Sequence, residues 1–253
     1  MDKNNEIKKL IETFHSEYTR NGEPIRINFR EIVTELSSTE RYSHLIHSYP
    51  AKLLCHIPYF FLQTDYFCPE NGVVLDPFCG TGTVMLEANI SGRNAKGADA
   101  NPLACLISKV KTTYIKKDDL QKTLGTIISR AKRFNTNEYI DTSSVSRWFS
   151  KSTISQLWHL EGAIKKVRDT KQQDFFMMCL SNLVKKVSFA DPSISVPVKL
   201  NPERFAQNPE RMESAKFKLK TLENIYVYDK FENICQLNIN RIESLKDVYS
   251  NGI

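Results

Sequence analysis

The sequence predicts an α/β protein with a doubly wound, Rossmann-like sheet that is incomplete in this chain and carries a large helical insertion. Three observations support this fold class. Residues 73–115 read as strand, glycine loop, helix, strand and helix, an alternation that is typical of parallel sheets. Residues 116–188 show the three- and four-residue apolar spacing of helices. One more strand is expected at 234–240, ICQLNIN.

The N-terminal elements come first. Residues 5–19 form a short amphipathic pattern, and a second helix is expected near 28–36. The segment 47–63 reads as a turn followed by an apolar helix. VVLDPF, beginning at Val73, is predicted to be a strand buried on both faces, because its apolar residues do not alternate with polar ones.

The next elements complete the expected core. TVMLEANISG is predicted to be a helix that stops near Gly92, and NAKGADA a second strand. A further helix starts at Asn101, with Pro102 in its first turn.

The rest of the chain is expected to be helical up to the returning strand. We predict three domains with boundaries at 1–115, 116–233 and 234–253. The second is a helical insertion and a candidate target-recognition region, interrupted by the proline-rich loop 190–210. Its helices are expected at 118–134, 152–169, 172–187 and 212–231.

The composition is that of a globular protein, with 41% hydrophobic and 25% charged residues. No apolar run approaches the roughly 18 residues that suggest a membrane span, and the first residues do not resemble a secretory signal. The six cysteines form no C-x-x-C pair, so we expect reduced thiols in a cytoplasmic protein and no metal site. The formal net charge of +6 suits a polyanionic partner.

The loop DPFCGTGT, residues 76–83, is the strongest local signal. Five of the nine glycines lie between residues 72 and 97, where they let a ligand approach the main chain beside a helix N-terminus. A dinucleotide or S-adenosylmethionine would fit such a loop, but the third glycine of the dinucleotide fingerprint and the Gly-Lys of a Walker loop are missing. Asp99 follows about 20 residues later, a spacing suited to hydrogen bonds with ribose hydroxyls.

The loop continues into A-x-x-x-G-R-x-x-x-G-x-D-x-N-P. Together these residues resemble motifs I and II of the DNA amino-methyltransferases, which methylate N6 of adenine or N4 of cytosine. HSYPAKLLCHIP, residues 47–58, resembles their motif X. The resemblance implies that S-adenosylmethionine is the cofactor, with its amino acid part in the loop, its ribose on Asp99 and its sulfonium side near motif X. The implied cofactor-binding residues are Tyr49, Pro50, Ala51, Lys52, Asp76, Pro77, Phe78, Cys79, Gly80, Thr81, Gly82, Thr83, Asp99, Ala100 and Asn101.

The catalytic tetrapeptide of this family is missing. It has the form Asp/Asn/Ser-Pro-Pro-aromatic, and it accepts the hydrogens of the target amine while the aromatic ring stacks on a flipped base. None of the ten prolines here is followed by a second proline. The nearest candidates begin at Asp191 and Asn201, and Asp191 is better explained as a turn former. We therefore name no catalytic residue in this chain.

The predicted sheet order leads to the same expectation. The family order is 3-2-1-4-5, and this chain provides candidates only for strands 1, 2 and 3, with Asn238 or Asn240 where the cofactor's adenine would be contacted. Strand 1 would be an uncovered edge, which parallel sheets avoid. We expect the chain to be the cofactor-binding subunit of a DNA methyltransferase, inactive until a second protein chain adds the tetrapeptide and the remaining strands. The alternatives are a truncated gene product, an RNA guanine-N2 methyltransferase and a non-catalytic binding subunit.

Overall fold

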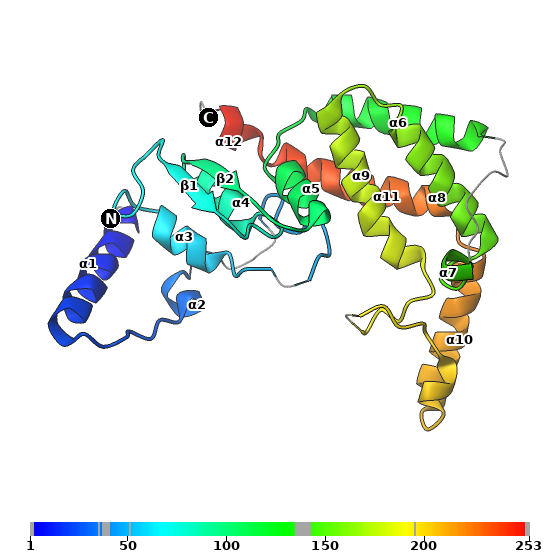
Figure 1. The fold of residues 1–253 in the computed structure, drawn as a ribbon, viewed down its shortest axis with the longest axis horizontal. Helices are drawn as coiled ribbons and strands as arrows, with labels where there is room; N and C mark the ends of the chain where they lie inside the picture. The colour runs from blue at the N-terminus through cyan, green and yellow to red at the C-terminus, as the bar shows by residue number, and fades with distance from the viewer. Residues whose placement is uncertain are drawn as a thin grey trace. The chain divides into compact units, whose positions relative to one another are not determined.

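The computed structural model describes residues 3–34, 36, 41–50, 52–134, 143–194 and 196–250. The chain divides into two compact units (Figure 1). Unit 1 comprises Met1–Tyr114 and Ser244–Ile253, and unit 2 comprises Ile115–Glu243. No helix in the described ranges is long and apolar enough to cross a membrane.

Unit 1 contains the predicted strand–helix–strand–helix order, and its last helix, α12, is tied to it by hydrogen bonds. The Tyr249 hydroxyl donates to the Thr112 carbonyl and accepts from Asn89 Nδ2. The elements of unit 1 are α1 (Lys3–Asn21), α2 (Phe29–Ile32), α3 (His56–Leu62), β1 (Val73–Asp76), α4 (Thr83–Ile90), β2 (Asn94–Gly97), α5 (Pro102–Lys111) and α12 (Lys246–Ser250).

The two strands confirm the beginning of the predicted sheet. β1 and β2 are parallel and pair from Val73 with Asn94 to Asp76 with Gly97, and α4 connects them and packs on both. Gly97 permits this packing, because a Cβ there would lie 2.3 Å from Met85 Sδ and 2.8 Å from Cys79 Cβ. Among the described residues the sheet has two strands, so the expected third strand is not part of it.

β1 is not the buried strand that the sequence predicts. Val73 is 57% exposed and Leu75 is 69% exposed. Within the part of the chain that the structure describes, β2 is the only strand paired with β1. The second edge of β1 and the sheet face that carries Val73 and Leu75 are therefore open to solvent.

The N-terminal helices of unit 1 enclose a small apolar core. Ile7 and Ile11 of α1 pack with Val33, Leu36 and residues of α3. Phe60 is 1% exposed and meets the Phe29 ring edge to face, with ring centroids 5.5 Å apart. This core supports α3, which in turn packs against α4 behind the glycine loop.

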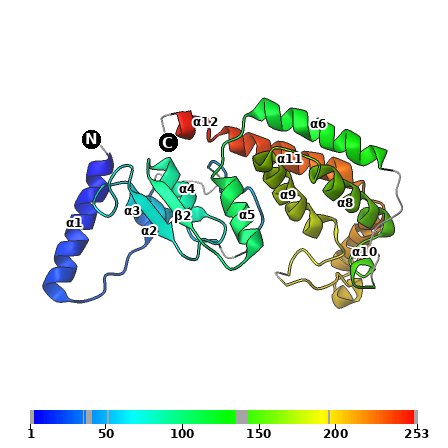
Figure 2. The same cartoon turned by 45° about the horizontal axis from the view of Figure 1, so that its top comes forward.

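Unit 2 is helical in its described part, and Figure 2 shows α6, α8, α9 and α11 gathered around a common core. Phe175, Phe176 and Phe231 are fully buried there, as is Leu160. The elements are α6 (Lys117–Arg133), α7 (Ser143–Ser146), α8 (Lys151–Ile164), α9 (Thr170–Val184), η1 (Lys185–Val187), η2 (Pro202–Phe205), α10 (Pro209–Glu223) and α11 (Val227–Glu243).

The prediction of a strand at 234–240 is wrong. These residues lie inside α11, and unit 2 continues through Glu243, past the domain boundary expected after residue 233. The buried residues of α11 recur every three or four positions, which is the helical period. ICQLNIN alternates like a strand only when it is considered alone. The buried residues of α11 are Val227, Tyr228, Phe231, Ile234, Cys235, Asn238, Ile239 and Ile242.

The helix expected at 212–231 is also divided in two. α10 ends at Glu223 and α11 begins at Val227. Asn224 and its neighbours form the break, and the Asn224 side chain donates to the Lys220 carbonyl. Asparagine favours such positions because its short polar side chain competes for main-chain hydrogen bonds.

Candidate functional site

The glycine loop is fixed to the ends of both strands. The Cys79 N–H donates to the Ala98 carbonyl over 2.8 Å, and the Ala98 N–H donates to the Asp76 carbonyl over 3.0 Å. The Asp76 side chain accepts from the Phe78 N–H at 3.1 Å. This Asx-type turn directs the chain away from β1 and leaves the Phe78 side chain 86% exposed.

Asp99 joins the loop to the segment that follows β2. One carboxylate oxygen accepts the Gly80 N–H at 2.9 Å, and the other accepts the Asn101 N–H at 2.8 Å. Asn101 caps α5 by accepting from the Leu103 N–H. Its Nδ2 donates to the Tyr49 hydroxyl at 2.9 Å. Three separate segments that the sequence analysis singled out are thus brought together.

The two loop glycines have different surroundings. Gly80 has a φ of +48° and Gly82 a φ of +73°, a region that residues with a Cβ rarely adopt. A Cβ on Gly82 would lie 2.4 Å from Ser108 Oγ of α5, whereas a Cβ on Gly80 would meet nothing within 4 Å. Gly82 is therefore needed for packing, and Gly80 faces open space.

The other predicted residues vary in position. Lys52 Nζ donates to the carbonyls of His47, at 2.6 Å, and His44, at 3.3 Å. Thr83 is buried at the start of α4, and burial raises the pKa of the Cys79 thiol. Ala51 lies outside the described residues. Pro50, Pro77 and Ala100 are exposed.

A buried polar cluster that the sequence analysis did not find lies behind the loop. Glu87 of α4 is 1% exposed. Its carboxylate accepts from His44 Nε2 at 2.7 Å and forms an ion pair with Arg41. Burial lowers the pKa of His44, although the hydrogen bond to Glu87 acts in the opposite direction. A neutral imidazole donating to an ionised carboxylate is consistent with both effects.

Three residues of this cluster could in principle ligate a metal ion. The ligand atoms of His44, Cys55 and Glu87 all lie within 4.8 Å of one another. However, the Glu87 carboxylate is already engaged by His44 and Arg41, and burial raises the pKa of the Cys55 thiol. The contacts of the cluster are therefore made within the protein itself, and they link α4 to the segment before α3.

Lys111, in the last turn of α5, is the second feature that was not predicted. It is 1% exposed, and its Nζ donates to Thr81 Oγ1 in the glycine loop over a long 3.5 Å. Burial is the main reason that its pKa falls to about 7. Its carbonyl accepts from the Ser43 hydroxyl at 2.7 Å. No sequence spacing connects Lys111 to Thr81, which lies 30 residues away.

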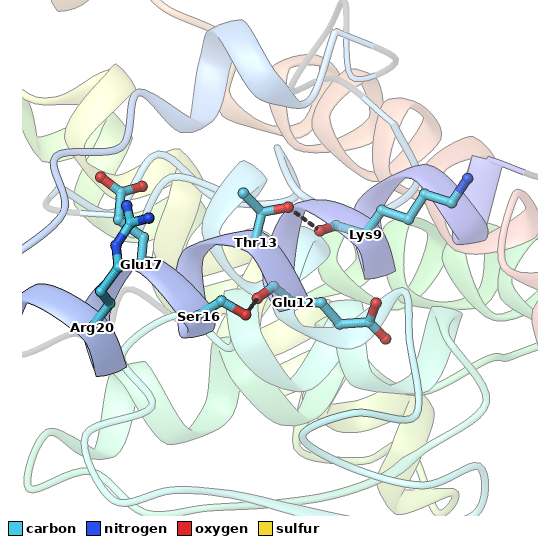
Figure 3. Close-up of a pocket in the computed structure, with 6 residues that line it drawn as sticks. All are labelled: Lys9, Glu12, Thr13, Ser16, Glu17 and Arg20. Atoms are coloured by element: carbon cyan, nitrogen blue, oxygen red, sulfur yellow. Dashed lines mark hydrogen bonds between the residues drawn. The ribbon is translucent and has the colours of Figure 1, made fainter.

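Two hollows in the structure do not include the loop. One, of about 620 Å³, lies along the exposed side of α1, and all its residues come from that helix (Figure 3). The other, of about 530 Å³, lies within unit 2 and is mainly apolar. The hollow along α1 is lined by Lys9, Glu12, Thr13, Ser16, Glu17 and Arg20. A face of a single helix offers no convergent groups for a ligand.

Two alternative candidates from the sequence are explained by the structure. Asp191 Oδ1 accepts from both the main-chain N–H and the hydroxyl of Ser193, as a turn former does. Asn238 lies in the core of unit 2, where it contacts Cys179 and Arg241. The expectation that Asn238 follows a third strand is therefore wrong, and Asn240 lies on α11 as well.

Comparison with known proteins finds a family that part of this chain resembles. Residues 16–110 match the N6/N4 methyltransferase family model, described as DNA methylase. This range contains the motif X segment, the glycine loop and Asp99. Over these residues the chain is similar to the DNA amino-methyltransferases. No solved structure matches it significantly.

Two curated relatives are also similar to part of the chain. The chain is 28% identical over 162 residues to the type II methyltransferase M.MvaI of Kocuria varians, covering 60% of this chain and 36% of that protein. It is 32% identical over 104 residues to M.MjaII of Methanocaldococcus jannaschii, covering 40% of this chain and 19% of that protein. The chain thus spans about a third and a fifth of these relatives.

Proposed function

We propose that unit 1 binds S-adenosylmethionine through the loop Asp76–Thr83 and Asp99. We further propose that the chain is the cofactor-binding subunit of a DNA amino-methyltransferase, and that a second polypeptide chain adds the catalytic tetrapeptide and the missing strands. S-adenosylmethionine supplies an activated methyl group on a sulfonium, which an exocyclic amine of adenine or cytosine can accept. The two curated relatives are named as type II methyltransferases, a class associated with restriction–modification.

The observation that carries this proposal is the position of Asp99. Its carboxylate stands at the end of β2, within hydrogen-bond distance of the glycine loop. A carboxylate has about four acceptor positions, so two hydrogen bonds from the main chain leave capacity for ribose hydroxyls. Gly80 faces open space beside it, and the α4 N-terminus starts at Thr83. These residues fit a ligand with a ribose and a polar amino acid tail.

The open edge of β1 supports the proposal of a second chain. An apolar strand with Leu75 69% exposed and Val73 57% exposed is a template for a further parallel strand. The Pro-Pro sequence of the catalytic tetrapeptide occurs nowhere in the 253 residues. A strand that pairs with β1 and ends in that tetrapeptide would cover the edge and bring the acceptor groups to the carboxyl end of β1.

The distribution of charge supports DNA as the partner of unit 2. Unit 2 contains 22 Lys and Arg against 15 Asp and Glu, whereas unit 1 contains 13 against 14. The net charge of the chain thus comes from unit 2. On α10, Lys218 and Lys220 are on the helix that also presents an exposed Phe217. Basic side chains on a helix surface suit contacts with phosphates, which provide much of the affinity of DNA-binding proteins.

The test combines binding and turnover. Calorimetry of the purified chain should show S-adenosylmethionine binding, and Asp99→Ala should weaken it at least tenfold, whereas Asp119→Ala, at an exposed position in the first turn of α6, should not. Methyl transfer from tritiated S-adenosylmethionine to mixed-sequence DNA should require the second chain. Transfer by this chain alone would contradict the two-chain proposal. Unchanged affinity in the Asp99 variant would contradict the site.

A further inference from the structure

Lys111 is a buried amine without a carboxylate partner. Its side chain is enclosed behind the glycine loop. Among the described residues its Nζ has one hydrogen-bond partner, Thr81 Oγ1, at the long distance of 3.5 Å. An ammonium group can donate three hydrogen bonds, and a buried charge is normally paired. This position therefore lacks an anion.

We propose that Lys111 is the cation that receives the carboxylate of the cofactor's amino acid, with the Thr81 hydroxyl as the link between them. This inference rests on the proposed function, because it assumes that S-adenosylmethionine binds at the loop. It goes further by assigning the anionic end of the cofactor to a residue outside the three motifs that the sequence reveals.

The charged groups around Lys111 do not provide a carboxylate that pairs with it, so a ligand could provide one. Glu87 of α4 attracts the ammonium, but its oxygens are held by His44 and Arg41. Lys52, in the motif X segment, repels it. A carboxylate that reaches Lys111 from the loop would therefore meet the amines of Lys111 and Lys52, while the oxygens of Glu87 are already engaged.

Cys55, at the start of α3, is another titratable neighbour, besides Lys52, Glu87 and His44. Burial raises the pKa of its thiol, so it is uncharged at neutral pH. It therefore does not supply the missing negative charge.

The position of Thr81 suits this link. Thr81 lies between Gly80, which faces open space, and Gly82, which is packed on α5. It is 5% exposed, so its hydroxyl is held in place. The hydroxyl accepts from Lys111 and remains able to donate its own hydrogen to a carboxylate.

Proton uptake on binding is the measurement that tests the proposal. The pKa of Lys111 falls to about 7, chiefly through burial and then through repulsion by Lys52, so at pH 8 the amine is mostly neutral in the free protein. A carboxylate beside it favours the charged form. Binding should therefore take up close to one proton at pH 8. Calorimetry in buffers of different ionisation enthalpy counts that proton without any assay of methyl transfer.

The ligands are S-adenosylhomocysteine, which has the amino acid, and 5′-methylthioadenosine, which lacks it. Lys111→Met should weaken S-adenosylhomocysteine binding about tenfold and abolish most of the proton uptake. It should leave 5′-methylthioadenosine binding unchanged, which also shows that the variant is folded. Lys109→Met, on the exposed side of the same helix, is the matched control.

The outcomes separate the two proposals. If Lys111→Met binds S-adenosylhomocysteine with the wild-type affinity and proton uptake, this inference is wrong while the cofactor site remains. If the variant weakens both ligands equally, Lys111 supports the fold and not the carboxylate, and the inference is again wrong. If the wild-type chain binds neither ligand, the proposed function fails and the inference fails with it.

Discussion

Replacement of Lys111 by methionine should stabilise unit 1, and the gain should decrease as the pH rises. The pKa of this lysine drops from its ordinary 10.5 to about 7, mainly because the amine is buried. Below pH 7 the amine is charged in both the folded and unfolded states, so the folded state carries the full cost of the buried charge. At about 1.4 kcal/mol for each pKa unit, that cost is about 5 kcal/mol.

The sign of the pH dependence follows from proton counting. Between about pH 7 and 10.5 the unfolded chain binds the proton and the folded chain does not, so the free energy of unfolding of the wild type rises with pH. The slope from this one group approaches 1.4 kcal/mol per pH unit. Above 10.5 both states are neutral and the cost is gone. Lys111→Met should lack this slope.

The assay must report on unit 1 alone. Both tryptophans, Trp148 and Trp158, lie in unit 2, so tryptophan fluorescence is unsuitable. We would equilibrate the chain in urea at several pH values between 6.5 and 8.5. A short hydrogen-exchange pulse at one fixed pH, followed by mass spectrometry of peptides from 73–111, then gives the unfolded fraction of unit 1. If the free energy of unfolding of unit 1 changes with pH equally in the wild type and in Lys111→Met, the reasoning is refuted. Lys109→Met should show the same pH dependence as the wild type.

Three further predictions concern packing and the open edge. Gly82→Ala should destabilise unit 1 by about 2 kcal/mol or more, because its Cβ would lie 2.4 Å from Ser108 Oγ at a φ of +73°. The same urea assay measures this change. An unchanged urea midpoint for unit 1 would contradict the close packing of Gly82 on α5. Phe231→Ala should destabilise unit 2 by about 3–5 kcal/mol, since this ring is fully buried against Phe176, and tryptophan fluorescence in urea should detect it. Leu75→Lys should change stability by less than about 0.5 kcal/mol but prevent co-purification of a second chain; if that chain is still retained, β1 is not its docking edge.

The sequence was sufficient to predict those secondary-structure elements whose signals are local. The apolar run before Asp76, the glycines of the loop and the cap at Asn101 each act within a few residues. They predicted β1, α4, β2 and α5 in the correct order. Such signals work because the strand, the tight turn and the helix N-terminus each depend on a few neighbouring side chains.

The strand expected at 234–240 failed because its local pattern is ambiguous. Cys235, Leu237 and Ile239 alternate with polar residues over 235–240, yet Leu237 is 60% exposed and the buried residues follow the helical period from Val227. A short apolar run cannot distinguish a strand from a helix segment without its surroundings. Packing of α11 against α6 and α9 decides the outcome, and that information is distributed over the whole of unit 2.

The polar cluster behind the loop was not predictable for a different reason. Glu87 and His44 are 43 residues apart, and Lys111 and Thr81 are 30 residues apart. No fixed spacing relates such pairs, because they meet only after α4 and α5 have packed. One signal was available, since Glu87 is the single charged residue of a mostly apolar helix, TVMLEANI. A charge at such a position must find a buried partner or face water.

The glycine loop contains glycines that the fold requires and one, Gly80, that the proposed cofactor site would explain. At Gly82 and Gly97 a Cβ would collide with Ser108 and with Met85, so the packing of α4 and α5 explains these glycines without any ligand. Gly80 is different, because a Cβ there would meet no protein atom while its N–H is held by Asp99. Gly80 is open in the protein, has a positive φ and adjoins a carboxylate, so core packing does not explain this glycine and the proposed ligand would. Gly80 and Asp99 therefore support the proposed cofactor site more strongly than the number of glycines in the loop does.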